Sequence, residues 1–192
     1  MDYKIILGVV ATLIGLVGYT IYFKEIFTKK IIPHAFSWLV WGILTSIAFA
    51  AQVVENGGAG AWNTGVTGLF CLIISVIGFT KGRKDFTKFD WICLITALIA
   101  IVLWWFTKNP TLSVILVTTI DAIGCFTTIR KSFHKPFEEN ATIFALSSSK
   151  FIIALFALET YTLATWLYPV SLVITNVIMM SVIIIRRMQL KK

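Results

Sequence analysis

The segment GYTIYFKEIF, residues Gly18–Phe27, has a faint counterpart later in the chain in GCFTTIRKSF, residues Gly124–Phe133. A shift of 106 residues aligns glycine with glycine at the start, phenylalanine with phenylalanine at the end, and Lys24 with Arg130 between them. Both segments lie at the end of a long apolar run. Because membrane proteins are often built by internal duplication, the repeat predicts a chain made of two related halves.

The composition is typical of a membrane protein, since 58% of the 192 residues are hydrophobic, 14% are charged and the mean hydropathy is +0.88. A helix needs roughly 20 mostly apolar residues to cross about 30 Å of hydrocarbon. Seven such runs, bounded by charged or turn residues, are expected to be transmembrane helices: Tyr3–Phe23, Ala35–Val54, Ala61–Thr80, Phe89–Thr107, Thr111–Ile129, Ala141–Leu158 and Tyr161–Ile185.

The repeat orders these runs into two groups of three. Runs one to three resemble runs five to seven, and a second alignment, at a shift of 104 residues, pairs Trp62 with Trp166. A single run between the groups gives both halves the same orientation in the membrane. The expected fold is an all-α membrane protein with seven transmembrane helices in a 3+1+3 arrangement of two parallel triple-helix bundles. It is a single transmembrane domain, residues 1–192, with a first triple-helix repeat at 1–80, a linker helix at 81–108 and a second triple-helix repeat at 109–192.

The net charge of +8 lies mostly on one side of the predicted membrane. Most basic residues follow the first, third, fifth and seventh runs: Lys24, Lys29, Lys30, Lys81, Arg83, Lys84, Lys88, Arg130, Lys131, Lys135, Arg186, Arg187, Lys191 and Lys192. The apolar runs predict that the protein crosses the cell (plasma or inner) membrane several times. The positive-inside rule then predicts that its N-terminus lies outside and its C-terminus in the cytoplasm. Contact with anionic lipids of the bilayer explains this charge, so no nucleic-acid partner is expected.

Residues that carry enzyme or metal chemistry are scarce. Cys71, Cys93 and Cys125 all fall within apolar runs and have no metal-ligand spacing, while His34 and His134 lie in separate loops. The chain has no phosphate-binding loop, no nucleophile elbow and no zinc-protease motif. We therefore expect no enzymatic activity, no cofactor and no metal.

A lysine interrupts the sixth run, LSSSKFIIALFAL at Leu146–Leu158. Lys150 lies nine residues after Ala141, and Asp121 lies nine residues before Arg130, so both are about 13 Å deep at a helical rise of about 1.5 Å per residue. An isolated charge at that depth costs between roughly 2.5 and more than 10 kcal/mol. We expect Asp121 and Lys150 to pair on adjacent antiparallel helices. The pair is either static, holding helices together, or part of a cavity where substrate or a proton displaces it.

The number of helices, the parallel halves and the topology resemble the SWEET and PQ-loop superfamily of small seven-helix transporters, in an uncharacterised bacterial branch. Pro33-His34 stands where that superfamily has its Pro-Gln dipeptide, within PHAFSWLVWG at Pro33–Gly42. The resemblance implies a membrane transporter. A cavity with one carboxylate, one ammonium group, an asparagine and aromatic walls suits a small polar metabolite such as an amino acid, a sugar or a vitamin-like compound. The resemblance also implies a binding site at mid-membrane between the two repeats, to which Asn176 contributes, and leaves room for proton coupling through Asp121.

Helical spacing indicates which side chains could line that cavity. The second run carries one aromatic and polar stripe: Trp38, Trp41, Thr45, Phe49 and Gln52. The third run carries a face of small and polar residues: Thr64, Thr67, Gly68, Cys71 and Ser75. Such faces also allow helices to pack closely without any cavity. The substrate-binding residues expected are Asp121, Lys150, Asn176, Trp41, Thr45 and Thr67.

Two other functions are compatible with these residues. Receptors that bind the C-terminus of a peptide share the implied fold, although they need several basic residues in the site and only Lys150 is available here. A photoreceptor would use Lys150 as a Schiff base for retinal with Asp121 as counter-ion, and the purified protein would be coloured. The sequence leaves open the substrate, the direction of transport and a possible homo-oligomer.

The charge distribution gives a topological prediction. Single cysteines at Lys29, Lys84 and Lys135 should react with a membrane-impermeant thiol reagent only from the cytoplasmic side, because all three lie in the predicted basic loops. Labelling of Lys84→Cys from outside intact cells would refute the predicted topology.

Overall fold

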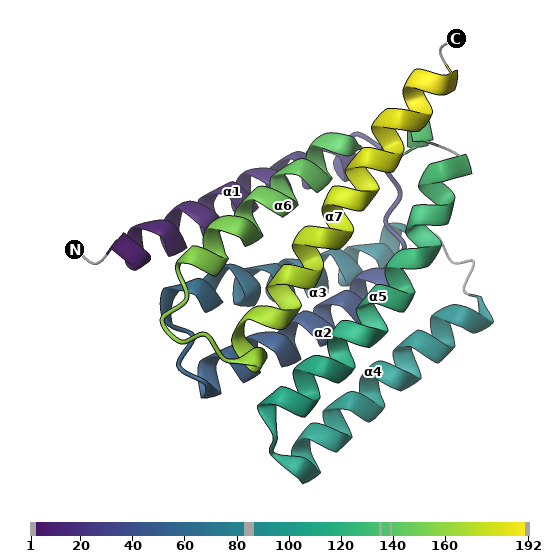
Figure 1. The fold of residues 1–192 in the computed structure, drawn as a ribbon. Helices are drawn as coiled ribbons and strands as arrows, with labels where there is room; N and C mark the ends of the chain where they lie inside the picture. The colour runs from purple at the N-terminus through teal and green to yellow at the C-terminus, as the bar shows by residue number, and fades with distance from the viewer. Residues whose placement is uncertain (1–2, 83–86, 135, 139, 191–192) are drawn as a thin grey trace.

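The computed structural model describes residues 3–82, 87–134, 136–138 and 140–190. This part of the chain consists of helices joined by short connections, and the described residues contain no strand (Figure 1). Its α-helices are α1 (Tyr3–Phe27), α2 (Ala35–Val54), α3 (Trp62–Lys81), α4 (Lys88–Thr107), α5 (Pro110–His134), α6 (Ala141–Phe156) and α7 (Leu163–Leu190). Two short 3-10 helices, η1 (Gly58–Ala61) and η2 (Pro136–Glu138), precede α3 and α6. The expected all-α class is therefore confirmed.

Four helical segments are long and apolar enough to cross a membrane: Tyr3–Phe27, Ala35–Val54, Gly58–Lys81 and Leu163–Leu190. Shorter apolar helices run over Trp91–Thr107, Pro110–Phe126 and Ala141–Phe156. Each expected run coincides with a helix, but α1, α5 and α7 continue four to five residues beyond the predicted ends. Hydropathy marks the apolar stretch only, whereas backbone hydrogen bonding continues into the polar residues that follow it.

Asparagine and glycine residues set several helix boundaries. Asn140 caps α6 by accepting a hydrogen bond from the amide of Thr142 at 3.0 Å. Asn109 does the same for α5 through the amide of Leu112 at 3.1 Å. Between α2 and α3, Gly58 has a φ of +62°, a conformation that glycine adopts without strain.

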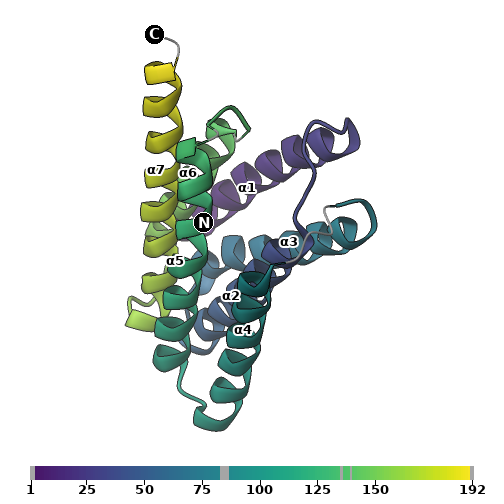
Figure 2. The ribbon, with the colours of Figure 1, turned by 90° about the vertical axis from the view of Figure 1, so that its right-hand side faces the viewer.

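The helices pack in a regular order. In the first group α3 packs against both α1 and α2, and in the second α7 packs against both α5 and α6. Between the groups, α1 packs against α6 and α2 packs against α5. Helix α4 packs against α2 and α5 on the outside of this arrangement (Figures 1 and 2).

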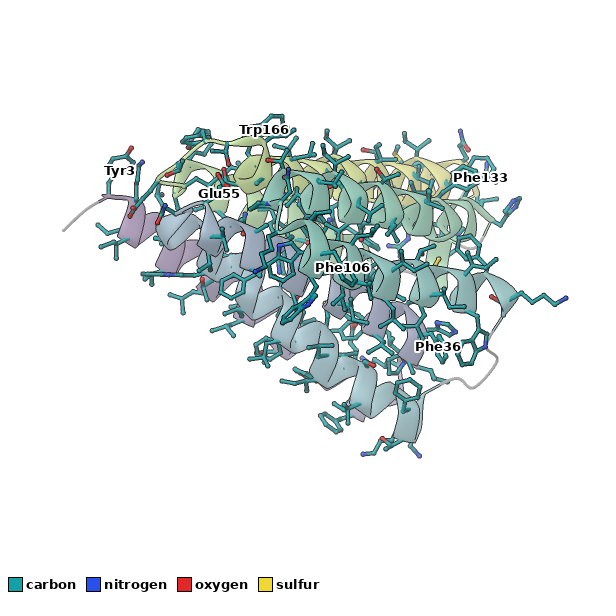
Figure 3. The ribbon with its side chains drawn as sticks, turned by 90° about the horizontal axis from the view of Figure 1, so that it is seen from below. Tyr3, Phe36, Glu55, Phe106, Phe133 and Trp166 are labelled. Carbon is teal, nitrogen blue, oxygen red and sulfur yellow. The ribbon has the colours of Figure 1, made fainter. Side chains whose placement is uncertain are left out.

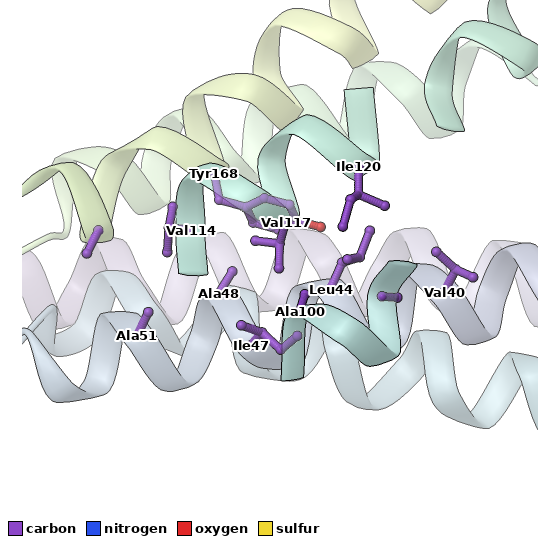
Figure 4. Close-up of a cluster of buried hydrophobic side chains, with 12 residues drawn as sticks. Val40, Leu44, Ile47, Ala48, Ala51, Ala100, Val114, Val117, Ile120 and Tyr168 are labelled. Atoms are coloured by element: carbon purple, nitrogen blue, oxygen red, sulfur yellow. The ribbon is translucent and has the colours of Figure 1, made fainter. Parts of the chain in front are cut away.

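One apolar cluster joins α2, α4, α5 and α7 (Figure 4). Its members are Val40, Leu44, Ile47, Ala48, Ala51, Ala97, Ala100, Val114, Val117, Ile120, Ala164 and Tyr168. Many of them are small, which allows the helix backbones to approach closely where lipid provides no hydrophobic drive for helix association. The cluster fixes α2 against α5 and α7, where the two groups of helices meet.

Large apolar side chains cover the outside of the molecule. Trp105 and Phe106, near the end of α4, are 77% and 78% exposed, and Phe106 is labelled in Figure 3, which draws the side chains as seen from below. Many other apolar residues of α1, α4 and α7 are exposed as well. An apolar exterior of this extent suits contact with lipid.

The two ends of the molecule differ in chemistry. At the basic end lie the α1–α2 connection, the end of α3 and the C-terminal turns of α7, with Lys24, Lys81, Arg186 and Arg187. At the opposite end, here the η1 end, the N-terminus of α1 lies with the α2–α3 and α6–α7 loops (Figure 1). Lys84 and Lys135, which belong to the expected basic loops, lie outside the described residues.

Backbone contacts close the η1 end. The amide of Gly60 donates to the carbonyl of Ala157 at 3.1 Å, and the amide of Glu159 donates to the carbonyl of Gly57 at 3.2 Å. The hydroxyl of Thr160 adds a bond to the carbonyl of Asn56 at 3.1 Å. The α2–α3 loop of one group is thus docked on the α6–α7 loop of the other.

This docking predicts a strict size limit at position 60. The Cβ of Gly60→Ala would lie 2.6 Å from the carbonyl oxygen of Ala154 and 2.7 Å from the amide nitrogen of Leu158. Because both are backbone atoms, we expect overpacking that costs about 1–3 kcal/mol and a lower thermal midpoint in detergent.

Gly124→Ala is the matched control, because a Cβ there meets no atom within 4 Å. Alanine is favoured over glycine in a helix interior by up to about 1 kcal/mol, so this variant should be as stable as the parent or more so. An equal loss of stability in both variants would contradict the packing described for the η1 end.

Candidate functional site

A cavity of about 1450 Å³ lies between the two groups of helices. Its lining comes from α1, α2, α3, α5, α6 and α7, from Phe89 at the start of α4, and from loop residues at the basic end, including Lys30, His34 and Asn140. No residue of η1 or of the α6–α7 loop contributes to it. In Figure 2 the ends of α1 and α3 that lead to the basic end lie well apart from the C-terminal end of α7. The cavity therefore extends from the basic end to the middle of the helices and stops short of the η1 end.

The cavity brings together all six residues expected to bind substrate. From the first group of helices, Trp41 and Thr45 of α2 and Thr67 of α3 line it. From the second group, Asp121 of α5, Lys150 of α6 and Asn176 of α7 line it. Their shared location is a feature of the structure, whereas substrate binding by them remains a prediction.

Lys150 is only 4% exposed and bonds to the first group of helices. Its Nζ donates to the hydroxyl oxygen of Thr67 on α3 at 2.8 Å and to that of Tyr19 on α1 at 3.3 Å. The same nitrogen lies 4.7 Å from the ring centre of Tyr19 and 5.0 Å from that of Phe151, within the range of cation–π attraction. Gly15 makes room for the lysine, because a Cβ there would lie 3.3 Å from its Cδ.

Asp121 is 1% exposed and has a different environment. Its Oδ2 accepts a weak hydrogen bond from the thiol of Cys125, one turn later on α5, at 3.7 Å. Among the described residues, no ion pair within 4 Å joins this carboxylate to Lys150.

The expected Asp121–Lys150 pair on adjacent helices is therefore wrong. The two residues line one cavity, but α5 and α6 both pack against α7, and Lys150 extends toward α1 and α3. Depth along a helix can be counted from sequence, whereas the lateral order of helices depends on tertiary packing. The cavity consequently contains a carboxyl group and an ammonium group that do not neutralise each other by direct contact.

Three more polar side chains lie along the cavity wall. The hydroxyl groups of Thr45 and Tyr168 share a buried hydrogen bond of 3.0 Å between α2 and α7. Asn176 donates from Nδ2 to the carbonyl of Leu172 on its own helix at 2.6 Å. Its amide group thus has a fixed orientation along α7.

Aromatic rings form the wall of the cavity nearer the basic end. The indole Nε1 of Trp38 donates to the hydroxyl of Tyr22 at 3.2 Å, and the two ring centres are 4.9 Å apart. Trp41 meets Trp38 edge to face at 5.3 Å. These three rings and Tyr19 line the cavity from α1 and α2. The arrangement offers apolar surface with polar edges, which suits a small ligand that is polar in part.

The two predicted faces contribute unequally to the cavity. From the stripe on α2, Phe49 and Gln52 lie outside the lining. On α3, Cys71 joins Thr67 in the cavity, whereas Gly68 packs against Ser46 of α2. The alternative that small residues serve helix packing is thus correct for part of the α3 face.

The sequence argument missed Tyr19 and Tyr168, whose hydroxyl groups bond to Lys150 and Thr45. A signal was present, because tyrosines within apolar runs need a partner for the hydroxyl group. Asn63 was missed as well: it is buried, both its polar side-chain atoms lack partners, and its Oδ1 lies 3.2 Å from the Cβ position of Gly15 beside Lys150.

No protein-family model matches the chain, and no curated protein or solved structure matches it either.

The separate environments of the two charged residues can be tested by double-mutant cycles on unfolding free energy in detergent. Asp121→Asn and Lys150→Met share no hydrogen-bond partner, so their effects should add within about 0.5 kcal/mol. Lys150→Met and Thr67→Val remove the two sides of one 2.8 Å bond and should show a coupling of about 0.5–3 kcal/mol. A coupling between Asp121 and Lys150 as large as that between Lys150 and Thr67 would contradict this geometry.

Proposed function

We propose that this chain is a membrane transporter for a small polar metabolite. The observation that carries the proposal is the cavity itself, which lies between two groups of helices, reaches only one end of the molecule and holds a buried carboxyl group and a buried ammonium group at its sides. A charged group within a membrane is costly, and such groups mark sites of substrate recognition or ion movement. An amino acid, a sugar or a vitamin-like compound fits such a cavity.

The packing order supports a seven-helix 3+1+3 arrangement of the SWEET and PQ-loop kind. The third helix of each group lies between the other two, as α3 packs on α1 and α2 and α7 packs on α5 and α6. The contacts between groups are equivalent too, because α1 on α6 corresponds to α5 on α2 under the repeat. In this proposal α4 is the linker helix that lets both halves have the same orientation.

The proposed binding residues approach the substrate from both halves. Trp41 and Thr67 act from the first half, and Asn176 and Lys150 act from the second. Lys150 and Asn176 offer hydrogen-bond donors, while Trp41 supplies an apolar ring. Asp121 is the group that could take up and release a proton during transport, since its carboxyl group contacts a thiol and not a cation.

The described conformation corresponds to one stage of transport. The cavity reaches the basic end, which the positive-inside rule assigns to the cytoplasm, and backbone contacts close the η1 end. The cavity would become accessible from the other side of the membrane if the η1 end opened while the basic end closed. A receptor on the same fold would bind its ligand in this cavity without moving it across the membrane.

Uptake into proteoliposomes tests the proposal. Candidate metabolites are first ranked by thermal shift, because a ligand that binds only the folded state raises its apparent stability. The best ligands should accumulate in liposomes that contain the parent protein. Asn176→Ala should abolish this uptake while the protein stays folded, because the change removes a hydrogen-bonding group and little packing volume. Binding without uptake would contradict transport and favour the receptor.

The native cysteines provide an internal control for where the ligand binds. Cys71 and Cys125 line the cavity, whereas Cys93 lies on α4 outside it. A bound substrate should slow alkylation of Cys71 and Cys125 and leave the rate at Cys93 unchanged. Equal protection of all three would indicate general stabilisation and not occupation of the cavity.

A further inference from the structure

Helix α7 contains a proline, Pro169, whose missing amide proton leaves a carbonyl without its usual partner. That carbonyl belongs to Thr165, four residues earlier. It accepts a hydrogen bond from Nε2 of Gln52 on α2 at 2.7 Å. Both Gln52 and Thr165 are 0% exposed. A side chain from the other group of helices thus supplies the donor that α7 lacks.

A second bond between the same two helices lies beside the first. Tyr168 directly precedes Pro169, and its hydroxyl group shares the 3.0 Å bond with Thr45. Thr45 and Tyr168 line the cavity, whereas Gln52 and Thr165 do not. Thr45 and Gln52 are seven residues apart, about two turns along α2. The two bonds therefore form consecutive links between α2 and α7, one at the cavity and one closer to the η1 end.

Gln52 is a costly residue for its position. Its Oε1 is buried and has no hydrogen-bond partner, which penalises the folded state. An apolar side chain together with a non-proline residue at 169 would satisfy the Thr165 carbonyl without this penalty. The combination of a proline and a half-satisfied glutamine indicates a role beyond the stability of this conformation.

We propose that Pro169 is a hinge in α7 and that Gln52 holds the hinge closed. The latch consists of two bonds, Gln52 to the Thr165 carbonyl and Thr45 to Tyr168. When the latch releases, the first turns of α7, Leu163–Tyr168, move away from α2 and open the cavity toward the η1 end. The hinge rests on the proposed transport function, because both require the cavity to open alternately to the two ends of the molecule. It adds the identity of the part that moves.

The strength of the latch suits such a role. Bending at Pro169 breaks no helical hydrogen bond to the Thr165 carbonyl, because proline has no amide proton to donate. Loss of one hydrogen bond changes an equilibrium by about two- to tenfold, so removing the Gln52 bond alone should shift the balance between the latched and released states by a measurable amount. Once the η1 end opens, water can reach the Oε1 of Gln52 and give it a partner.

A double-mutant cycle between Gln52→Leu and Pro169→Ala tests the proposal. The reporter is Cys71 in a Cys93→Ser, Cys125→Ser background, labelled by a membrane-impermeant thiol reagent in vesicles of both orientations. Gln52→Leu should raise the rate of labelling from the η1 side by about two- to tenfold, because one bond of the latch is lost. In the Pro169→Ala background the same change should have no effect, because the alanine amide now bonds to the Thr165 carbonyl.

Gln189→Leu, on the exposed last turn of α7, is the control and should leave labelling from the η1 side unchanged. The proposal is overturned if Gln52→Leu does not change this labelling, or changes it equally with and without Pro169→Ala. If Gln52→Leu does not fold, Pro169→Ala alone decides: it should raise the thermal midpoint and lower the labelling, and unchanged labelling overturns the hinge. The assay needs no substrate, so a chain that transports nothing still gives a definite answer.

Discussion

Lipid offers no hydrogen bonds, so a polar group within the apolar helices is costly unless it finds a partner in the protein. Many hydroxyl groups meet this requirement locally, as Thr12 and Thr67 do by donating to the carbonyl four residues earlier. Long or charged side chains, which do not bond to a carbonyl of their own helix in this way, form hydrogen bonds to another helix. Those longer contacts, from Lys150 and from Gln52, join the two groups of helices, the first beside the cavity and the second closer to the η1 end.

The same requirement explains which features could be predicted from sequence. Helix positions follow from runs of apolar residues and from caps such as Asn140, both of which are local properties. Candidate residues such as Thr45 and Thr67 were found because helical spacing is also local, whereas Asn176 was taken from the resemblance to the SWEET and PQ-loop superfamily. These arguments give the height of a residue in the molecule and the face of the helix on which it lies.

The partner of each residue could not be predicted in this way. Lys150 and Asp121 have similar depths, but the position of α7 between α5 and α6 gives them different neighbours. The hydroxyl groups that bond to Lys150 come from helices distant in sequence. Pro169 was a visible signal within the last run, yet its link to Gln52 depends on the contact between α2 and α7. Lateral order is the information that one sequence lacks.

The docking of the two loops at the η1 end has a consequence for sequence divergence. Two of its three bonds join backbone atoms of Gly57 and Gly60 to those of Ala157 and Glu159, so these two do not depend on the identity of any side chain, and the third comes from the hydroxyl of Thr160. Selection at this site acts on side-chain volume in the α2–α3 loop, where glycine must be kept. It acts only weakly on the polarity of the residues in the α6–α7 loop. Relatives of this chain could therefore diverge widely in the α6–α7 loop and still close in the same manner. A small-residue segment after the second helix would be a more durable mark of common descent than any charged or aromatic motif.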